Sequence, residues 1–364
     1  MAGAGLRLRP ASECRWDAVA LGEVMLRFDP GEDRIARTRQ FRVWEGGGEY
    51  NVVRGLRSCF ALRTAVVTAL VDNPVGRLVE DLVRQGGVDA SEVLWRADDG
   101  VGRAARNGLY FLERGFGVRG AMGAMDRGHT AVSQIAPGEV DWERLFGEEG
   151  VRWLHTGGIF CALSGSTRAV ALEAMAAAKR HGTAVSFDCN YRPSLWRAQG
   201  GRAGAIALNR ELAAYVDVLF GHEGDLGLEL TDAAAGPPVH TMETYAAMAK
   251  RLFAEHAALQ VIATPTRRAR TATVNDWGGY GATRYGSWAA PEMVGLEILD
   301  RVGGGDAFAA GVLYGLMNGK AMEWAVRCGV AHGALAMTTA GDSSFASLAE
   351  VERVMAGEGA GVRR

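Results

Sequence analysis

The sequence is poor in lysine, cysteine and long apolar runs, and each shortage excludes a class of protein. Its only lysines are Lys179, Lys250 and Lys320, and the 364 residues carry a net charge of −2, whereas a nucleic-acid-binding domain is usually strongly basic. The five cysteines form no C-x-x-C pair, which argues against a disulfide framework or a structural zinc site. Apolar runs stay well short of the ~18–20 residues that span a bilayer.

What remains is an ordinary globular composition, with 48% hydrophobic and 23% charged residues. That balance excludes a disordered chain, which would combine few apolar residues with high net charge. Residues 1–15 contain arginines but no apolar stretch, so we expect no secretory signal. We therefore expect a cytoplasmic protein with neither a nucleic-acid nor a membrane partner.

Short apolar runs alternate with segments of helical period along most of the chain. This alternation predicts a doubly wound, mostly parallel sheet with helices on both faces. The predicted strands are Val19–Leu21, Ala65–Val67, Val151–Leu154, Ala184–Phe187, Val216–Phe220 and Val261–Ala263. The predicted helices are Val75–Gln85, Thr167–Arg180, Thr244–His256, Ala307–Met317, Met322–Met337 and Leu348–Met355.

Two segments, Glu23–Trp44 and Gly108–Met125, interrupt this rhythm. The second predicts a hairpin of Leu109–Leu112 and Val118–Ala121 around the turn Arg114–Gly117. The two segments could pair into a small accessory sheet, which would either cover a cleft or form a dimer edge.

The sharpest motif is Asp300-Arg-Val-Gly-Gly-Gly-Asp306, which leads into a predicted helix. Backbone N–H groups at a helix start bind anions, and glycines let a phosphate approach closely. A carboxylate there is suited to take a proton from an attacking hydroxyl. The alternative is a plain turn in which Asp306 caps the helix.

Two further segments have the character of a ligand site. Glu45-Gly-Gly-Gly-Glu-Tyr-Asn51 could present backbone and amide groups to a polyhydroxylated ligand, or Asn51 could simply cap the next helix. Phe187–Trp196 follows a strand, where α/β folds bind ligands, although an ordinary loop is equally open. Neither glycine run is a Walker A loop or a dinucleotide fingerprint.

The order of these motifs resembles that of the ribokinase-like (PfkB) family of sugar kinases. Besides the two glycine motifs, the matching elements are Leu21–Leu26, Gly108–Phe111, Asp126–Arg127 and Asp188-x-Asn190-x-Arg192. This set is similar to the branch that acts on 2-keto-3-deoxygluconate, and it spans about residues 17–350. The resemblance implies a ribokinase-like α/β fold in one kinase domain over residues 16–355. A small β-sheet lid is expected at about 23–45 and 104–130.

The resemblance also implies roles for individual residues. Asp306 is the expected base, and the amides of Gly303, Gly304 and Gly305 are expected to stabilise the transferring phosphoryl group. The expected sugar-binding residues are Gly46, Gly47, Asn51, Tyr110, Arg127 and Arg192. Those expected to bind nucleotide are Asn190, His222, Thr264, Arg267 and His332, with Asp225 at the metal. ATP and Mg²⁺ are the implied co-substrate and metal, and a homodimer or higher homo-oligomer is expected.

Two elements depart from the family pattern. An Asn-x-x-Glu element linked to magnesium is replaced by Gly221-His-Glu-Gly-Asp225, and a glycine-containing nucleotide turn is replaced by Thr264–Arg270. The favoured hypothesis is ATP-dependent phosphorylation of 2-keto-3-deoxygluconate, to its 6-phospho product, or of a close sugar acid. The alternatives are a kinase of a neutral sugar or nucleoside, such as fructose, ribose or adenosine, and a kinase-derived sugar-acid-binding regulatory protein.

Overall fold

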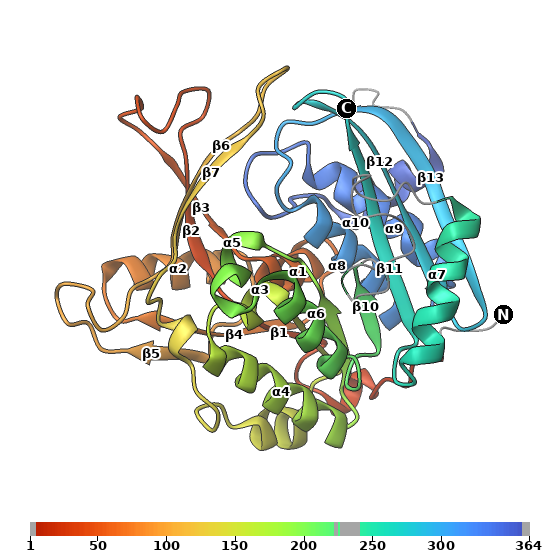
Figure 1. The fold of residues 1–364 in the computed structure, drawn as a ribbon, viewed down its shortest axis with the longest axis horizontal. Coiled ribbons are helices and arrows are strands. Elements are labelled where there is room, and N and C mark those ends of the chain that lie inside the picture. The colour runs from red at the N-terminus through yellow and green to blue at the C-terminus, as the bar shows by residue number, and fades with distance from the viewer. Residues whose placement is uncertain (1–4, 222–224, 226–240, 359–364) are drawn as a thin grey trace.

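The computed structural model describes residues 5–221, 225 and 241–358, which form one large and one small β-sheet (Figure 1). The large sheet has nine strands in the order β13-β12-β11-β10-β9-β8-β1-β4-β5. Neighbouring strands from β11 to β5 run parallel, and only β12 and β13 at one edge are antiparallel. The predicted doubly wound, mostly parallel α/β sheet is confirmed.

Six of the nine strands overlap the predicted apolar runs, and several are longer than predicted, whereas β5, β12 and β13 were not predicted. Because both faces are covered, β4 is buried along its whole length. The strands are β1 (Ala18–Leu21), β4 (Thr64–Val71), β5 (Val93–Arg96), β8 (Trp153–Gly157), β9 (Ala184–Asp188), β10 (Val218–Phe220), β11 (Val261–Ala269), β12 (Val274–Thr283) and β13 (Gly286–Glu297).

Helices connect these strands, and their starts follow local capping chemistry. Ser164 and Thr167 form a reciprocal capping box at the start of α4. The helices are α1 (Gly48–Ser58), α2 (Pro74–Gln85), α3 (Gly158–Cys161), α4 (Gly165–Arg180), α5 (Pro193–Trp196), α6 (Gly201–Leu212), α7 (Met242–Glu255), α8 (Gly304–Met317), α9 (Met322–Ala336) and α10 (Leu348–Ala356), with a π-helix at Glu143–Gly150. Among the described residues, none of these helices has the length and apolar character to cross a bilayer.

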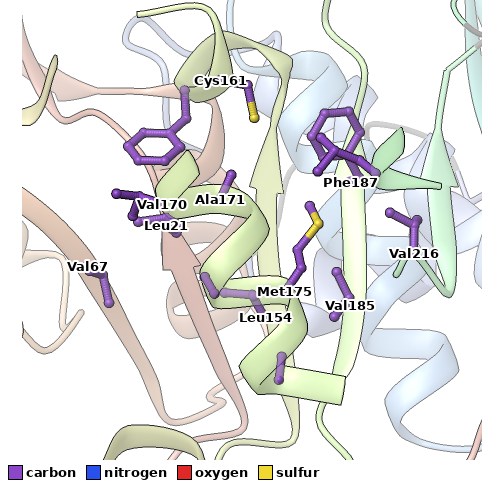
Figure 2. Close-up of a cluster of buried hydrophobic side chains, with 14 of the residues drawn as sticks. Leu21, Val67, Leu154, Cys161, Val170, Ala171, Met175, Val185, Phe187 and Val216 are labelled. Carbon is purple, nitrogen blue, oxygen red and sulfur yellow. The ribbon is translucent and has the colours of Figure 1, made fainter. Parts of the chain in front are cut away.

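Two hydrophobic cores lie on the two faces of the large sheet. Side chains alternate along β1, so that Val19 and Leu21 enter one core and Ala18 and Ala20 the other. Figure 2 shows part of the first core, where Val170, Ala171 and Met175 of α4 lie among residues of the central strands. The second core is closed by α1, α8, α9 and α10. This double cover fixes the strand ends, where the site is found.

The small sheet contains β2 (Met25–Asp29), β3 (Arg42–Gly46), β6 (Leu109–Glu113) and β7 (Met122–Asp126), in the order β3-β2-β6-β7. It is mixed, because β2 and β6 are parallel whereas the two outer pairs are antiparallel. In Figure 1 it projects beside the large sheet. It is the predicted small β-sheet beside the main α/β unit.

The predicted hairpin is present, but its second strand was placed wrongly. The strand is Met122–Asp126 rather than Val118–Ala121, and Glu113 pairs with Met122. The intervening segment is closed by a bridge between Phe116 and Arg119. Its glycines form a longer turn than expected, and Gly117 has a positive φ of 56°.

Helices α8 and α9 pack closely through glycines, and this contact can be tested. A Cβ atom on Gly311 would lie 2.7 Å from Cα of Gly329. Gly311→Ala should therefore lower the free energy of unfolding by about 1–3 kcal/mol, measured by urea denaturation. Gly165→Ala is the matched control, since its Cβ would meet open space, and it should leave stability unchanged or slightly raised. Equal effects of the two variants would contradict this packing.

Candidate functional site

Polar residues gather where the central parallel strands end, which is the usual ligand-binding edge of such a sheet. Glu23 follows β1, Gly157 ends β8, Asp188 ends β9 and Gly221 follows β10. Strand pairing places these ends beside one another, with Gly157 directly opposite Asp188. The segment after each strand therefore faces one shared region.

The glycine loop before α8 borders this region. Gly303 has a left-handed backbone with φ of 79° and serves as the N-cap of α8. A side chain there would overlap the carbonyl oxygen of Asp342, so only glycine fits. Gly304 packs against Met337, whereas a Cβ on Gly305 would meet open space. The first N–H groups of a helix lack intrahelical acceptors, which leaves this end of α8 suited to an anion.

Asp306 and Asn51, predicted from separate motifs, meet at this helix start. The Asn51 side-chain amide donates to Asp306 Oδ2 over 2.7 Å, and its Oδ1 accepts from the N–H of Gly47 over 3.3 Å. Asn51 lies in the first turns of α1, directly after the second glycine run. The two glycine motifs, about 250 residues apart in sequence, are thus linked by one amide.

The second glycine run lies against two other parts of the site. A side chain on Gly46 would overlap the Asp342 carboxylate, and one on Gly48 would contact the Asn190 amide at 3.4 Å. Asn190 follows Asp188, whose Oδ1 accepts the backbone N–H of Asn190 over 3.0 Å. Its φ of 32° is positive. The structure therefore brings Gly46, Asn190 and the predicted base into one region.

Three carboxyl groups here have strongly raised pKa values. Burial raises the pKa of Asp306 to about 7, and the charges of Asp188 and Asp342 add to this effect, although the Asn51 hydrogen bond opposes it. Burial likewise raises the pKa of Asp188 and of Glu49 to about 7. Raised carboxyl pKa values of this kind are typical of functional sites.

Glu49, which belongs to the Glu45–Asn51 motif, is a buried residue for which no role was predicted. Its side chain is 3% exposed, and its Oε1 accepts the backbone N–H of Phe160 over 3.1 Å. Its Oε2 is buried with no hydrogen-bond partner. The charge of Arg127 lowers its pKa and that of Asp306 raises it, so both groups lie near Glu49.

The two predicted substrate arginines have different surroundings. Arg127 forms an ion pair with Glu23, which is 1% exposed. Arg192 is exposed, and within the described chain the only hydrogen bond of its side chain goes to the carbonyl of its neighbour Tyr191. Its charge nevertheless acts on both Asp188 and Asp306. Arg192 is therefore a cation at the site that is open to a ligand.

Among the residues predicted to bind nucleotide, Arg267 is a second arginine that is open to a ligand. Its neighbours Arg268 and Arg270 both bind Asp276, whereas Arg267 has no such partner among the described residues. Burial lowers the pKa of Arg267, and the nearby charge of Arg301 lowers it further. Arg301 follows Asp300 at the head of the glycine motif and was missed, although the motif contained it.

Three predicted ligand contacts are not supported by the side-chain positions. Thr264 is 0% exposed and donates to the carbonyl of Gly221 over 2.6 Å, so it joins β11 to the end of β10. His332 is also 0% exposed and lies in the core against Phe60. The Tyr110 hydroxyl is buried and donates to Asp342. The side chains of Thr264 and His332 are thus enclosed by the protein, and the Tyr110 hydroxyl already has Asp342 as its partner.

The predicted metal-binding element is only partly described. His222 lies outside the described residues. Asp225 is close to the end of β10, since a Cβ on Gly221 would lie 3.1 Å from its Oδ2, and its charge raises the pKa of Asp188. In the described part of the chain, no group of three or more His, Cys, Asp or Glu side chains is arranged to hold a metal ion.

Comparison with known proteins agrees with this arrangement. A family model described as "pfkB family carbohydrate kinase" matches residues 17–348. The chain belongs to the PfkB family. It is therefore a carbohydrate kinase, a phosphotransferase that acts on a sugar hydroxyl, and the predicted family is confirmed.

Individual relatives within the PfkB family are similar over nearly their whole length. A 2-dehydro-3-deoxygalactonokinase from Haloferax volcanii is 30% identical over 96% of this chain and 99% of its own. A 5-dehydro-2-deoxygluconokinase from Bacillus licheniformis is 27% identical, over 95% and 98%. The crystal structure of a 2-dehydro-3-deoxygluconokinase from Thermotoga maritima superposes with a TM-score of 0.83 at 30% identity, covering 93% of this chain and 99% of that one. The ribokinase-like fold is thereby confirmed.

The buried carboxyl of Glu49 should make stability depend on pH. Because its folded pKa of about 7 exceeds its ordinary value of 4.5, ionising it destabilises the fold as pH rises from about 4.5 through 7. Glu49→Gln should therefore raise the free energy of unfolding by roughly 2–3 kcal/mol at pH 8 and by little at pH 4. Urea denaturation at both pH values measures this.

Glu148→Gln is the control for that comparison, since Glu148 is exposed and should show no difference between the two pH values. A Glu49→Gln gain that is the same at pH 4 and pH 8 would contradict a raised pKa.

Proposed function

We propose that the protein is an ATP-dependent kinase of a keto-deoxy sugar acid, with 2-keto-3-deoxygluconate and its 6-phospho product as the first candidates. One observation carries the proposal. Asp306 is held by Asn51 at the open start of α8, with Arg192 close enough to act on its pKa. That juxtaposition supplies a base, an anion site and a cation for a carboxylate.

Asp306 is the proposed base. A hydroxyl oxygen of the sugar attacks the terminal phosphorus of ATP, its proton passes to an Asp306 carboxylate oxygen, and ADP leaves with the electron pair of the broken bond. The Asn51 side-chain amide donates a 2.7 Å hydrogen bond to Oδ2 of Asp306, and this bond orients the carboxylate. A pKa of about 7 suits a general base near neutral pH.

The backbone N–H groups of the Gly303–Gly305 loop are the proposed stabilisers of charge on the moving phosphoryl group. Gly305 borders open space, so a phosphate can approach without meeting a side chain. Preorganised donors of this kind contribute about 3–4 kcal/mol each to transition-state stabilisation. The helix dipole of α8 adds in the same direction.

Arg267, Asn190 and Asp225 are the proposed contacts for ATP and Mg²⁺. Mg²⁺ prefers oxygen ligands and is commonly held by one or two carboxylates together with substrate phosphates. The neighbouring carboxylates of Asp225 and Asp188 fit that donor set. When bound, the ion would neutralise phosphate charge, and Arg267 offers a further cation.

Arg192 is the proposed partner of the substrate carboxylate. A guanidinium binds a carboxylate through paired hydrogen bonds, and Arg192 is exposed with only a neighbouring carbonyl as partner. The three relatives named above are keto-deoxy sugar-acid kinases by name, which supports the same substrate class. A neutral sugar or nucleoside would leave this cation unpaired, and a purely regulatory protein would not need a base held beside an anion site.

The predicted self-association has support from one feature of the small sheet. Strand β7 is an outer strand, and all five of its residues are exposed. An unpaired, exposed edge is available to a second copy.

The first experiment measures ADP release with a panel of acceptors. The panel holds 2-keto-3-deoxygluconate, 2-keto-3-deoxygalactonate, 5-keto-2-deoxygluconate, gluconate, fructose, ribose and adenosine. We expect selective turnover of a keto-deoxy acid, and a loss of kcat of at least about 10³-fold in Asp306→Asn, because an amide cannot accept the proton. Wild-type activity should fall as pH drops below about 7, where Asp306 becomes protonated.

Unchanged turnover in Asp306→Asn would exclude the base role. Turnover of only a neutral acceptor would replace the sugar-acid proposal with the neutral-sugar alternative, and sugar-acid binding without ADP release would favour the regulatory protein.

Arg192→Met tests the carboxylate contact. Losing a charge-assisted hydrogen-bond pair costs about 1.5–3 kcal/mol, so the KM for the sugar acid should rise roughly 10- to 100-fold, while any residual activity on a neutral sugar stays unchanged. Arg127→Met is the comparison variant, because Arg127 is already paired with Glu23. Equal losses on acidic and neutral acceptors in Arg192→Met would contradict the carboxylate role.

A further inference from the structure

An arginine is fully buried where the small sheet meets the main body of the kinase. Arg27 lies in the middle of β2 and is 0% exposed. Its guanidinium binds Asp29 over 2.9 Å and Asp342 over 2.8 Å, and it also pairs with Asp300. Neighbouring carboxylates hold the pKa of Arg27 above its ordinary value, so the side chain stays charged.

Asp300 connects this arginine to the phosphoryl-binding loop. Its Oδ1 accepts the backbone N–H of Val302 over 3.2 Å, and its Oδ2 accepts that of Gly341 over 3.3 Å. Val302 directly precedes Gly303 and packs against the small-sheet cluster of Met25, Tyr110 and Leu112. Fixing Asp300 therefore fixes the backbone turn from which the Gly303–Gly305 loop starts.

Asp342 connects the same arginine to the sugar-binding segment. Its carboxylate is so close to Gly46 that a side chain there would overlap it, and its backbone carbonyl is equally close to Gly303. The Tyr110 hydroxyl also donates to this carboxylate. Asp342 thus lies directly between the two glycine motifs.

We propose that Arg27 is a positioning residue that sets the placement of the Gly46–Gly47 segment relative to the Gly303–Gly305 loop. The inference rests on the proposed function, in which the first segment holds the sugar and the second the phosphoryl group. In-line transfer needs both reactants aligned, and a misplacement of about 1 Å can cost about 10²-fold in rate. Arg27 touches neither reactant in this account and acts through Asp300 and Asp342.

Arginine suits this position better than lysine. Its planar guanidinium offers five donors in a rigid fork, whereas an ammonium is a compact point charge. One cation can then hold carboxylates from β2, from the segment before α8 and from the segment after α9. Arg27→Lys keeps the charge but loses the fork, so it separates geometry from charge.

The experiment compares kcat, both KM values and thermal stability of Arg27→Lys with those of the wild type, assayed well below the unfolding temperature. We expect kcat to fall about 10²-fold, with each KM changed less than about threefold. Asp300→Asn should show the same pattern, because it breaks the contact from the loop side. Removing the charge altogether, as in Arg27→Met, could unfold the protein, and these two conservative variants test the proposal without that risk.

Asp29→Asn is the matched control. Asp29 binds Arg27 within the same buried cluster, but its other side-chain contacts are Arg114 and the backbone of Gly31, in the segments that follow β6 and β2. Its loss should lower thermal stability and leave kcat within about threefold of the wild type. A merely structural cluster would instead give stability losses in all three variants with no change in kcat.

If the wild-type protein turns over a sugar acid and both Arg27→Lys and Asp300→Asn keep the wild-type kcat, this inference alone is overturned. Absence of turnover in the wild-type protein with every acceptor would overturn the proposed function and this inference together, so the two failures are distinguishable.

Discussion

The arrangement of the site depends on a buried charge cluster in which one guanidinium joins three carboxylates. Removing Arg27, Asp29, Asp300 and Asp342 from water has a cost of several kcal/mol per ion, which their mutual attraction offsets only in good geometry. The cluster is therefore a poor source of net stability. What it does provide is a geometric constraint, since the carboxylates come from segments far apart in sequence, with 315 residues between Arg27 and Asp342. The chain can satisfy these charges only when the small sheet and both glycine motifs are in their places.

A similar cost arises near the strand ends, where Glu49 is buried and the carboxyl groups of Asp306 and Asp188 are half-buried. Their pKa values near 7 mean that ionisation opposes folding at neutral pH. A core optimised for stability would hold apolar residues in these positions. Their presence fits a site that needs carboxylates poised to exchange a proton, and the two well-packed cores on the faces of the sheet supply the stability that tolerates them.

Much of the fold and part of the site follow from local sequence. Apolar runs and helical periods predict the central strands and the C-terminal helices, because burial on both faces and capping act over a few residues. The glycine motifs predict where the backbone lets a ligand approach, whereas the contact that requires glycine at Gly303 and Gly46 in the structure is with Asp342 of the same chain. The end of the turn predicted at Arg114–Gly117 was misplaced because several glycines permit more than one loop length, and strand pairing with β6 decides between them.

Side-chain availability is what local sequence cannot supply, and the two arginines show why. Arg127 and Arg192 have equal charge and both lie in polar segments, so motif matching assigns them the same role. Their difference comes from Glu23, 104 residues from Arg127, which is buried at the end of β1 and takes up the charge of Arg127. Arg192 has no such partner in the described chain and stays open to a ligand. His332 and Thr264 resemble Arg127 rather than Arg192, since their side chains are buried and already have partners within the protein. A residue's function here is decided by which long-range partners already satisfy it.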